Sequence, residues 1–397
     1  MTIIQVVPSI GDESSGPSYS VPGLCCGLVE NGCDVSLHFA GKTPARKFSF
    51  PVHAYPVKRF PHPRIGRSSE MLKGLKEACK EADIVHNNSF WMFPNVYPAM
   101  AKKGTKCKIV NAPRGTLAEW SLKHHWLQKK LFGWFGGQYV AMAATDMWHA
   151  TCEKEYEEIR ALGYRQPVAI VPIGMDLPEV EPRNTQNTLN DGRKRKRIVF
   201  FGRLHKVKAV DNLVLAWEKI CSQSAPTSSV CSVDSVVQNW ELVIAGPDGG
   251  VRRELEALVS DRKIPRVSFV GEINGDAKYR LLSAADIYVL PSLTENFGVT
   301  VAEALVSGTP VIASQGTPWQ GLEREKCGRW VPIGVESLAA ALDELMSMSE
   351  EERAAMGARG REWIRRDFSW KGIGTKMKAA YEWLLGQGEK PEWVVSR

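Results

Sequence analysis

Residues 291–314, PSLTENFGVTVAEALVSGTPVIAS, carry the clearest fold signal in the chain. The β-branched run at 287–290 predicts a buried strand that leads through a loop into a helix ending at Gly308. Pro310 opens a further β-branched run. A strand, a helix and a second strand in this order predict a parallel βαβ unit with a right-handed crossover.

The same alternation recurs along the 397 residues and predicts an α/β protein with parallel sheets. Strands are expected at 3–7, 34–39, 84–86, 107–110, 169–172, 198–201, 242–245, 267–270, 287–290 and 311–313. A Pro- and Asn-rich stretch at 173–197 predicts a linker, so we expect domains at 1–178 and 193–370. The segment 371–397 is predicted to be helical, to dock on a domain already built, and to have no strand after its helix. The Ser-rich stretch 221–237 is predicted to be a surface insertion without an assigned role.

Composition excludes several classes of protein. With 44% hydrophobic residues the chain is not disordered, and a net charge of +7 is too mild for a nucleic-acid packaging protein. Nine cysteines without a Cys-x-x-Cys pair favour a reducing compartment over a disulfide framework or a zinc site. Because no signal peptide and no apolar run of about 18 residues is present, we expect a cytoplasmic protein with at most peripheral membrane contact.

Two carboxylates, Glu295 and Glu303, lie on either side of a predicted helix start. In a helix their spacing corresponds to about 12 Å of rise, too far to share a proton, so they suit the two ends of one long ligand. Gly298 lies beside the helix N-terminus, where free N–H groups favour a phosphate. The alternative is that Glu303 faces solvent and Glu295 caps the helix.

A basic loop follows the strand predicted at 198–201. Arg203 and Lys208 flank it, and together they can neutralise a diphosphate without a metal. The alternative is an ordinary solvated loop. No Asp-x-Asp pair occurs in the sequence, and His124, His125 and His205 have no acidic or cysteine partners at ligand spacing, so we expect no metal.

Three loops of the first half come directly after predicted strands, where open α/β sheets bind ligands. The first contains Gly16 and has neither a dinucleotide-binding nor a Walker-type glycine pattern; an ordinary flexible turn is equally expected here. The others read HNNSFW at 86–91 and NAPRGT at 111–116.

The string from Glu295 to Glu303, with Phe297-Gly298 inside it, resembles the Glu-x7-Glu motif of retaining GT-B glycosyltransferases of family GT4, also called group 1. Gly202-Arg203-Leu204 and Lys208 resemble the basic element of that family, although Ala209 replaces a glycine. The resemblance implies two Rossmann-like domains facing across a cleft, with a C-terminal helix that crosses back to the first domain.

The resemblance also implies roles for residues. The acceptor side would be His86, Asn88, Arg114 and Gly115, and either Arg114 or His86 would take the role of a histidine common in relatives. The catalytic residues would be Glu295, Arg203, Lys208 and Arg114. The donor-binding residues would be Gly16, Arg203, Lys208, Gly271, Glu295, Asn296, Phe297, Gly298, Val299, Thr300 and Glu303.

The implied activity is retaining, metal-independent and cofactor-free transfer of a sugar from a UDP- or GDP-linked donor. The implied acceptor is a hydroxyl of a glycan or of a polyprenyl-diphosphate-linked glycan, in bacterial surface-polysaccharide or lipopolysaccharide synthesis, and nucleic acid is not expected as a partner. Two alternatives remain open: a GT-B nucleotide-sugar epimerase or phosphorylase, and a non-catalytic protein that binds lipid or nucleic acid.

Residues 120–135 mix tryptophans with lysines. Such a helix can lie on an anionic bilayer at the inner face of a membrane. Our slightly preferred expectation is the plainer one, that the tryptophans pack in the core and the lysines are solvated.

Overall fold

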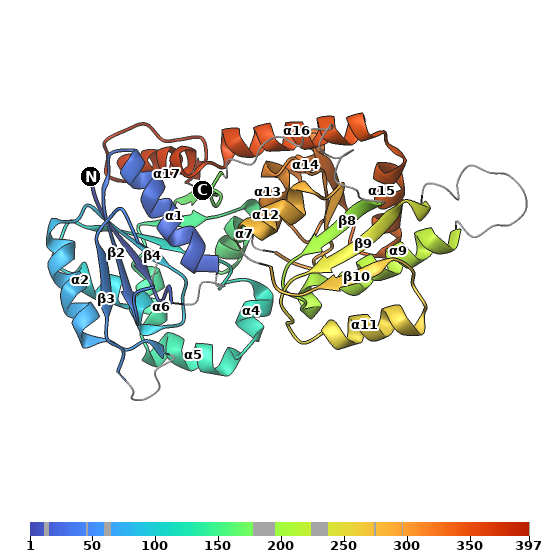
Figure 1. Cartoon of the computed structure of the whole chain (residues 1–397). Helices are drawn as coiled ribbons and strands as arrows, with labels where there is room; N and C mark the ends of the chain where they lie inside the picture. Colours follow the sequence, from blue (N-terminus) through green and yellow to red (C-terminus); the bar gives the residue numbers. More distant parts are fainter. Residues whose placement is uncertain are drawn as a thin grey trace, which may run out of the picture. The chain divides into compact units, whose positions relative to one another are not determined.

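The computed structural model describes residues 1–11, 16–44, 47–58, 65–177, 195–223, 237–273, 275–295 and 297–396. The chain forms two compact units (Figure 1). Unit 1 comprises Met1–Asp176 and Asp367–Arg397, and unit 2 comprises Leu177–Arg366. The chain therefore returns to unit 1 at Asp367, a few residues before the position expected from the sequence. Most of the predicted linker lies outside the described residues.

Unit 1 is built on an eight-stranded sheet of order β14-β7-β6-β5-β4-β1-β2-β3. Its strands are β1 (Thr2–Val7), β2 (Asp34–Ala40), β3 (Val52–Tyr55), β4 (Ile84–Asn88), β5 (Lys108–Ala112), β6 (Met147–Ala150), β7 (Val168–Ile170) and β14 (Val394–Val395). Strand β14 is antiparallel to β7, whereas the other pairs are parallel. The expectation that no strand follows the C-terminal helix is wrong. Two residues are enough to add an edge strand, because β7 offers them an open edge.

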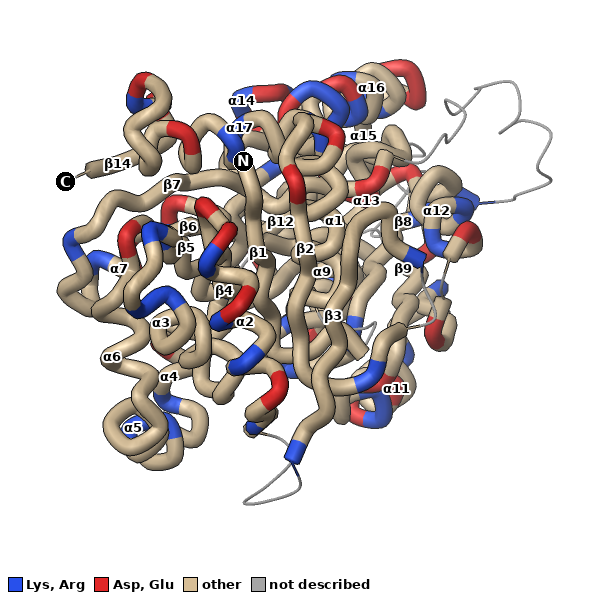
Figure 2. The backbone as a smooth tube through the Cα atoms, turned by 90° about the vertical axis from the view of Figure 1, so that its left-hand side faces the viewer, with Lys and Arg blue, Asp and Glu red and all other residues tan. Residues whose placement is uncertain are grey.

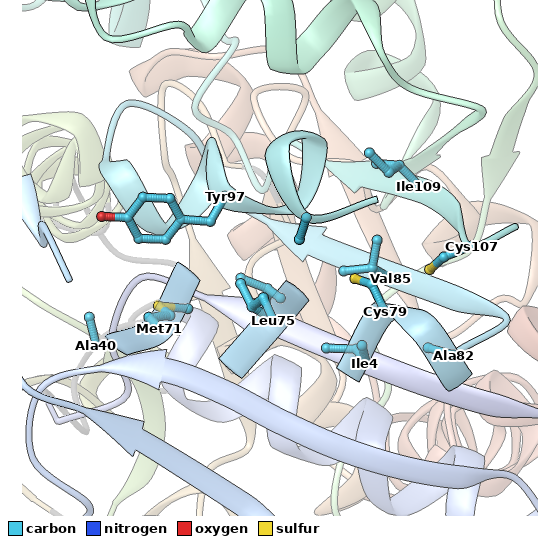
Figure 3. Packing of buried hydrophobic residues seen from close by; sticks show 12 residues of the cluster. Ile4, Ala40, Met71, Leu75, Cys79, Ala82, Val85, Tyr97, Cys107 and Ile109 are labelled. Atoms are coloured by element: carbon cyan, nitrogen blue, oxygen red, sulfur yellow. The ribbon is translucent and has the colours of Figure 1, made fainter. Parts of the chain in front are cut away.

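The helices of unit 1 are α1 (Gly16–Glu30), α2 (Ser69–Glu81), η2 (Phe93–Asn95), α3 (Tyr97–Ala101), α4 (Glu119–Lys123), α5 (Trp126–Phe135), α6 (Gln138–Ala143), α7 (Glu153–Ala161) and α17 (Trp370–Leu384). Helix α2 shows how the sequence forms its core. Met71, Leu75 and Cys79 recur every four residues and pack on Ile4 and Val85 of the sheet (Figure 3). Successive side chains of a strand point to opposite faces of the sheet. Gln5 follows Ile4 in β1 and therefore faces the side of the sheet opposite to α2.

Helices α1 and α17 lie together in unit 1 although they are far apart in the sequence (Figure 1). Glycines permit this contact. A Cβ on Gly27 would lie 2.1 Å from the backbone oxygen of Trp370, and a Cβ on Gly374 would lie 2.2 Å from the backbone oxygen of Gly27. The indole of Trp370 occupies the space beside Gly23 and Gly174 in the same way. The C-terminal segment is thus an integral part of unit 1.

Unit 2 holds a six-stranded sheet of order β10-β9-β8-β11-β12-β13. Its strands are β8 (Lys196–Phe201), β9 (Trp240–Ala245), β10 (Val267–Val270), β11 (Ile287–Leu290), β12 (Val311–Ser314) and β13 (Gly328–Val331). Its helices are η3 (Lys206–Lys208), α9 (Val210–Gln223), α11 (Arg252–Asp261), α12 (Asp276–Ser283), α13 (Val299–Val306), α14 (Gly321–Arg324), α15 (Val335–Ser347) and α16 (Glu350–Asp367). Of the predicted insertion, residues 221–223 complete α9 and residues 224–236 lie outside the described part.

Candidate functional site

The basic loop after β8 and the acidic loop after β11 are joined in unit 2. The backbone N–H of Leu293 donates to the carbonyl of Val207, at 2.8 Å. This bond brings Lys208 to Glu295, with 2.5 Å between Nζ and Oε1. Ser292 donates its hydroxyl to the same carboxylate oxygen, at 2.6 Å. Two groups that the sequence assigned to phosphate and sugar therefore form one ion pair in this structure.

The loop that carries Glu295 is hydrogen-bonded to the end of β12 and to the loop after it. The backbone N–H of Glu295 donates to the carbonyl of Gly316, at 2.8 Å, and Ser314 donates its hydroxyl to the carbonyl of Ser292. A Cβ on Gly316 would lie 2.4 Å from the oxygens of Ser292 and Leu293, so only glycine permits this approach. The carboxylate is thereby positioned by backbone contacts on a fixed loop.

Trp319 fixes the turn into helix α13. Its indole N–H donates to the carbonyl of Phe297, at 2.5 Å, and its ring packs against the Phe297 ring. Gly298 follows with φ of 78°, a left-handed conformation that favours glycine, and α13 begins at the next residue. The first N–H groups of a helix have no partner within it, so this turn presents donors beside Glu295. Asn296 lies outside the described residues.

Thr300, a predicted donor-binding residue, uses its side chain inside the fold. The Tyr288 hydroxyl donates to the carbonyl of Phe201, at 3.1 Å, and lies 2.6 Å from the Thr300 hydroxyl. Burial raises the pKa of Tyr288 well above its ordinary value. Any ligand contact of Thr300 is therefore expected through its backbone, as it is for Val299.

Glu303 is buried at 6% exposure, and Lys278 of α12 lies 2.6 Å from its Oε1. Gly298, not Glu295, stands at the start of α13, and no side chain caps that helix. The alternative in which Glu303 faces solvent and Glu295 caps the helix is thus wrong. Instead, each carboxylate of the pair has a lysine partner, Lys208 for Glu295 and Lys278 for Glu303.

The ends of β8, β9 and β10 converge on the same edge of the sheet. Gly246 donates its N–H to the carbonyl of Gly271, at 3.1 Å, and a Cβ on Gly246 would lie 2.0 Å from the oxygen of Gly202. Arg203 is exposed next to this contact, and among the described residues no acidic side chain pairs with it. Ala209, which replaces the family glycine, adopts φ of 46° and so keeps the left-handed turn.

Arg114 and Asn88 lie together at the carboxyl edge of the unit 1 sheet. The Arg114 guanidinium donates from Nε and Nη2 to Oδ1 of Asn88, at 3.2 and 3.0 Å. Arg114 has φ of 54°, and Ser89 and Trp91 in the neighbouring loop have φ of 69° and 76°. Non-glycine residues in left-handed conformations cost about 1 to 3 kcal/mol each and cluster at functional sites.

The Gly115 N–H donates to Oε1 of Glu155, at 2.7 Å. The other carboxylate oxygen of Glu155 accepts from the N–H and the hydroxyl of Thr151. The buried Glu155 carboxylate thus accepts three hydrogen bonds and holds the turn that carries Arg114. Gly16, the remaining predicted residue of unit 1, is exposed at the start of α1.

His86 is fully buried, and so is Asn88. The ring nitrogens of His86 contact His149 on one side and Tyr381 and Gln5 on the other. Burial lowers the pKa of His86 well below its ordinary value. Protein groups surround both side chains, and a direct contact of either with an acceptor stays a prediction. Arg114 and Gly115, which follow β5, are partly exposed.

The buried histidines of unit 1 make its stability pH-dependent. Burial lowers the pKa of His149 to about 3, and burial together with His53 lowers the pKa of His38 to about 3. Between pH 6.5 and 5 the unfolded chain binds protons that the folded unit does not. The free energy of unfolding should then fall with falling pH, by up to about 1.4 kcal/mol per pH unit for each histidine.

Denaturant unfolding at pH 7.0, 6.0 and 5.0 measures this slope. The His38→Asn variant should show a shallower slope than the wild type, because one of the titrating groups has been removed. Equal unfolding free energies at pH 7.0 and 5.0 in the wild type would contradict the expectation.

The helices α4, α5 and α6 carry a cluster of exposed apolar side chains, here called the α4–α6 surface: Trp120, Trp126, Leu127, Leu131, Trp134, Phe135 and Val140. The exposed fractions of Trp120, Trp126 and Trp134 are 57%, 59% and 71%, so the expectation that these tryptophans pack in the core is wrong. The charged residues of α5 are Lys129 and Lys130 (Figure 2). In the described part of the chain, no helix has the length and apolarity needed to cross a membrane.

Comparison with known protein families gives one match for each half of the chain. Residues 15–179 match glycosyltransferase family 4, and residues 183–363 match the glycosyl transferases group 1. The chain belongs to the group 1 glycosyltransferase family. Its two units, whose sheets are parallel except for the edge strand β14, have the GT-B fold expected for that family.

Relatives of this family member are diverse. An uncharacterized glycosyltransferase of Methanocaldococcus jannaschii is 32% identical over 44% of this chain and 41% of its own length. An MMP alpha-(1->4)-mannosyltransferase of Mycolicibacterium hassiacum is 27% identical over 54% of this chain and 47% of its own length. The matches thus span about half or less of these relatives. Sucrose-phosphate synthase of Thermosynechococcus elongatus shares the fold, with a TM-score of 0.70 at 21% identity, covering 97% of this chain and 99% of that one.

Several residues of the family member that shape its site were not singled out from the sequence. Trp319 and Gly316 come after β12, Lys278 comes from α12, and Gly246 opens a Gly-rich loop, GPDGG, after β9. That loop was the one available signal, because glycine clusters after a parallel strand indicate close backbone approach. Glu155 gave no signal, since a helical glutamate is usually exposed.

Proposed function

We propose that this chain is a retaining, metal-independent glycosyltransferase that moves a sugar from a UDP- or GDP-linked donor to a hydroxyl of a glycan or lipid-linked glycan. The observation that carries the proposal is the joined loop pair of unit 2. There Lys208, Glu295 and the start of α13 converge, and Glu303 is held by Lys278 about one turn further along the same helix. This arrangement suits a diphosphate, a sugar and a ribose bound in sequence.

In the proposed reaction the bond between the anomeric carbon and the diphosphate oxygen breaks. The acceptor oxygen bonds to that carbon on the same face, and its proton passes to the departing diphosphate. Arg203, Lys208 and the N–H groups at the start of α13 stabilise the negative charge that develops on the diphosphate. Glu295 binds the sugar and so holds its anomeric carbon in position for the reaction. On donor binding Lys208 exchanges part of its contact with Glu295 for a phosphate oxygen.

Calorimetric titration with UDP, GDP and ADP, each with and without a chelator, tests the donor site. We expect one nucleotide to bind at micromolar affinity with or without chelator, and the Glu303→Ala variant to lose that binding. Glu336→Ala is the matched control, because Glu336 also pairs with a lysine, Lys219, but on the exposed surface of unit 2. Failure of all three nucleotides to bind would contradict the proposal.

Product analysis separates the proposed transfer from the alternative activities. A nucleotide-sugar epimerase converts the donor when no acceptor is present, and a phosphorylase needs phosphate in place of an acceptor alcohol. For a transferase we expect a new glycosidic product only when both donor and acceptor alcohol are present. Conversion of the donor alone to an isomeric nucleotide sugar would favour the epimerase.

We further propose that the α4–α6 surface meets an anionic bilayer, at the inner face of a membrane, where a polyprenyl-diphosphate-linked acceptor of surface-polysaccharide or lipopolysaccharide synthesis would be presented. Leu127, Leu131 and Trp134 form one exposed stripe on α5, and Lys130 lies exposed beside it. Exposed aromatic and leucine side chains with flanking lysines, and no acidic residue in the helix, complement an anionic lipid surface.

Co-sedimentation with vesicles tests this surface. We expect binding to vesicles that contain anionic lipid, weaker binding to purely zwitterionic vesicles, and loss of binding in Trp134→Glu. Leu162→Glu is the matched control, because Leu162 is an exposed leucine elsewhere in unit 1. Self-association of the wild type through these residues, without vesicle binding, would instead assign the surface to a second copy of the chain.

A further inference from the structure

We propose that Tyr381, on the C-terminal helix α17, is a positioning residue for Arg114 at the acceptor side of unit 1. This inference rests on the proposed function, because the acceptor role of Arg114 is part of it. Tyr381 and Arg114 have no direct hydrogen bond in this structure. Buried polar side chains of the sheet join them instead, and the direction of each hydrogen bond follows from the chemistry of the groups.

The direction of the hydrogen bonds in this side-chain network is set first at His149. Its Nε2 lies 2.8 Å from the carbonyl of Val171, and because a carbonyl only accepts, Nε2 carries the proton. Nδ1 of the neutral ring is then an acceptor, and Nε2 of His86, 3.3 Å away, donates to it. This assignment leaves Nδ1 of His86 as an acceptor. The Tyr381 hydroxyl lies 2.6 Å from that atom and so donates its proton to it.

From His86 the hydrogen-bond network continues to Arg114 through the side-chain amides of Gln5 and Asn88. Gln5 Nε2 lies 3.3 Å from the same His86 Nδ1, so its amide nitrogen faces the histidine. Its oxygen therefore faces Asn88, whose Nδ2 donates to it at 3.0 Å. With the Asn88 nitrogen used in this way, its Oδ1 points to Arg114 and accepts from the guanidinium. The Gln5 amide thus has one orientation, set by the acceptor state of His86 Nδ1. The Asn88 nitrogen is held by Gln5 together with the backbone carbonyls of Val6 and His86, at 3.1 and 3.3 Å.

Burial makes this chain of bonds specific. Gln5, His86, Asn88 and Tyr381 are each fully buried, so water cannot replace a missing partner without rearrangement. Without the Tyr381 hydroxyl, His86 Nδ1 keeps only the longer contact with Gln5. The tautomer of His86 stays fixed by His149, but the Gln5 amide can move towards His86, its contact with Asn88 loosens, and the acceptor for the Arg114 guanidinium is held less tightly.

The Tyr381→Phe variant tests the inference, because it removes the hydroxyl and keeps the ring. Tyr97→Phe is the matched control. Tyr97 is also buried in unit 1, and its hydroxyl accepts the N–H of Ser68 at the start of α2, away from Arg114. The variants are compared in the full chain, after circular dichroism has shown that both are folded.

The first readout does not need enzymatic activity. NMR of the histidine ring nitrogens should show the Nε2–H tautomer of His86 in all three proteins, because His149 sets it, with the Nδ1 resonance shifted in Tyr381→Phe alone. The Nε–H of Arg114 should exchange with solvent at least about tenfold faster in Tyr381→Phe than in the control. An unchanged exchange rate of the Arg114 Nε–H in Tyr381→Phe would overturn the inference, whatever the activity.

The second readout is transfer kinetics. In Tyr381→Phe we expect kcat/KM for the acceptor to fall by about tenfold, whereas the KM for the donor and the rate of donor hydrolysis stay at wild-type values. A double-mutant cycle should show that Tyr381→Phe has no further effect once Arg114 is alanine. An equal fall in Tyr97→Phe, or additive effects in the cycle, would overturn the inference.

The two readouts separate this inference from the proposed function. If the NMR changes appear and Arg114→Ala leaves acceptor kinetics unchanged, the acceptor role of Arg114 in the proposed function is wrong and positioning for an acceptor falls with it. If Arg114→Ala impairs transfer but Tyr381→Phe does not, the inference alone is overturned.

Discussion

Replacing Lys208 by alanine is expected to lower the kcat of sugar transfer at least about a hundredfold while the KM for the acceptor stays near its wild-type value. The reason is that Lys208 would act on charge that develops as the diphosphate leaves, and removal of one such stabilising group costs about 10² to 10³ in kcat. Arg203→Ala should behave in the same way, because the exposed guanidinium of Arg203 stands on the same basic loop. Steady-state kinetics with both substrates varied measures the effect.

The loop offers its own control. Lys206 is exposed in the same short 3₁₀ turn as Lys208. Lys206→Ala removes an equal charge and should leave kcat within about twofold, because a solvated lysine contributes little at this range. Wild-type turnover in both Lys208→Ala and Arg203→Ala would remove the role assigned to the basic loop. A fall in Lys206→Ala equal to that in Lys208→Ala would show that only the net charge matters.

The second large effect concerns stability. Gly27→Ala is expected to destabilise unit 1 by about 3 kcal/mol or more, because its Cβ would lie 2.1 Å from the backbone oxygen of Trp370. The atom in the way is backbone, so no rotamer change relieves the overlap and α17 must move away from α1. Hydrogen exchange of the α17 amides measures the loss directly, and denaturant unfolding gives its size.

Gly16→Ala in the same helix is the control for stability. A Cβ at Gly16 meets nothing within 4 Å, so this variant should unfold within about 0.5 kcal/mol of the wild type. Gly374→Ala should reproduce the loss seen for Gly27→Ala, since its Cβ would overlap the Gly27 carbonyl. Wild-type protection of α17 in Gly27→Ala would show that the two helices tolerate separation.

The fold could be predicted from the sequence where the signal is local. The buried strands of unit 2 are short β-branched runs, and the turn at Gly298 follows from the residues around it. Strands β3, β6 and β13 were missed because Val52–Tyr55, Met147–Ala150 and Gly328–Val331 contain few β-branched residues and gain their strand conformation from neighbours in the sheet.

The same distinction between local sequence signals and contacts with distant elements applies to the candidate site. Glu295, Glu303, Arg203 and Lys208 belong to sequence strings with fixed spacing, so they could be singled out. Partners that come from another element could not, because nothing in the sequence links Lys278 to Glu303 or Tyr381 to His86. The exposure of the tryptophans on α4 and α5 could not be predicted either, since an aromatic helix has the same sequence pattern in a core and on a surface.

The discontinuous make-up of unit 1 bears on how the chain is made. Residues 1–176 leave the ribosome first, but their sheet lacks β14 and their α1 lacks α17 until residues 367–397 have also emerged. Unit 2 is continuous and can complete its core in the meantime, because all of its residues emerge before residue 367. During that interval Gln5 and His86 face a gap where Tyr381 will later sit. Unit 1 of the nascent chain therefore stays incomplete until residues 367–397 emerge. This makes it the part of the chain most in need of chaperone protection.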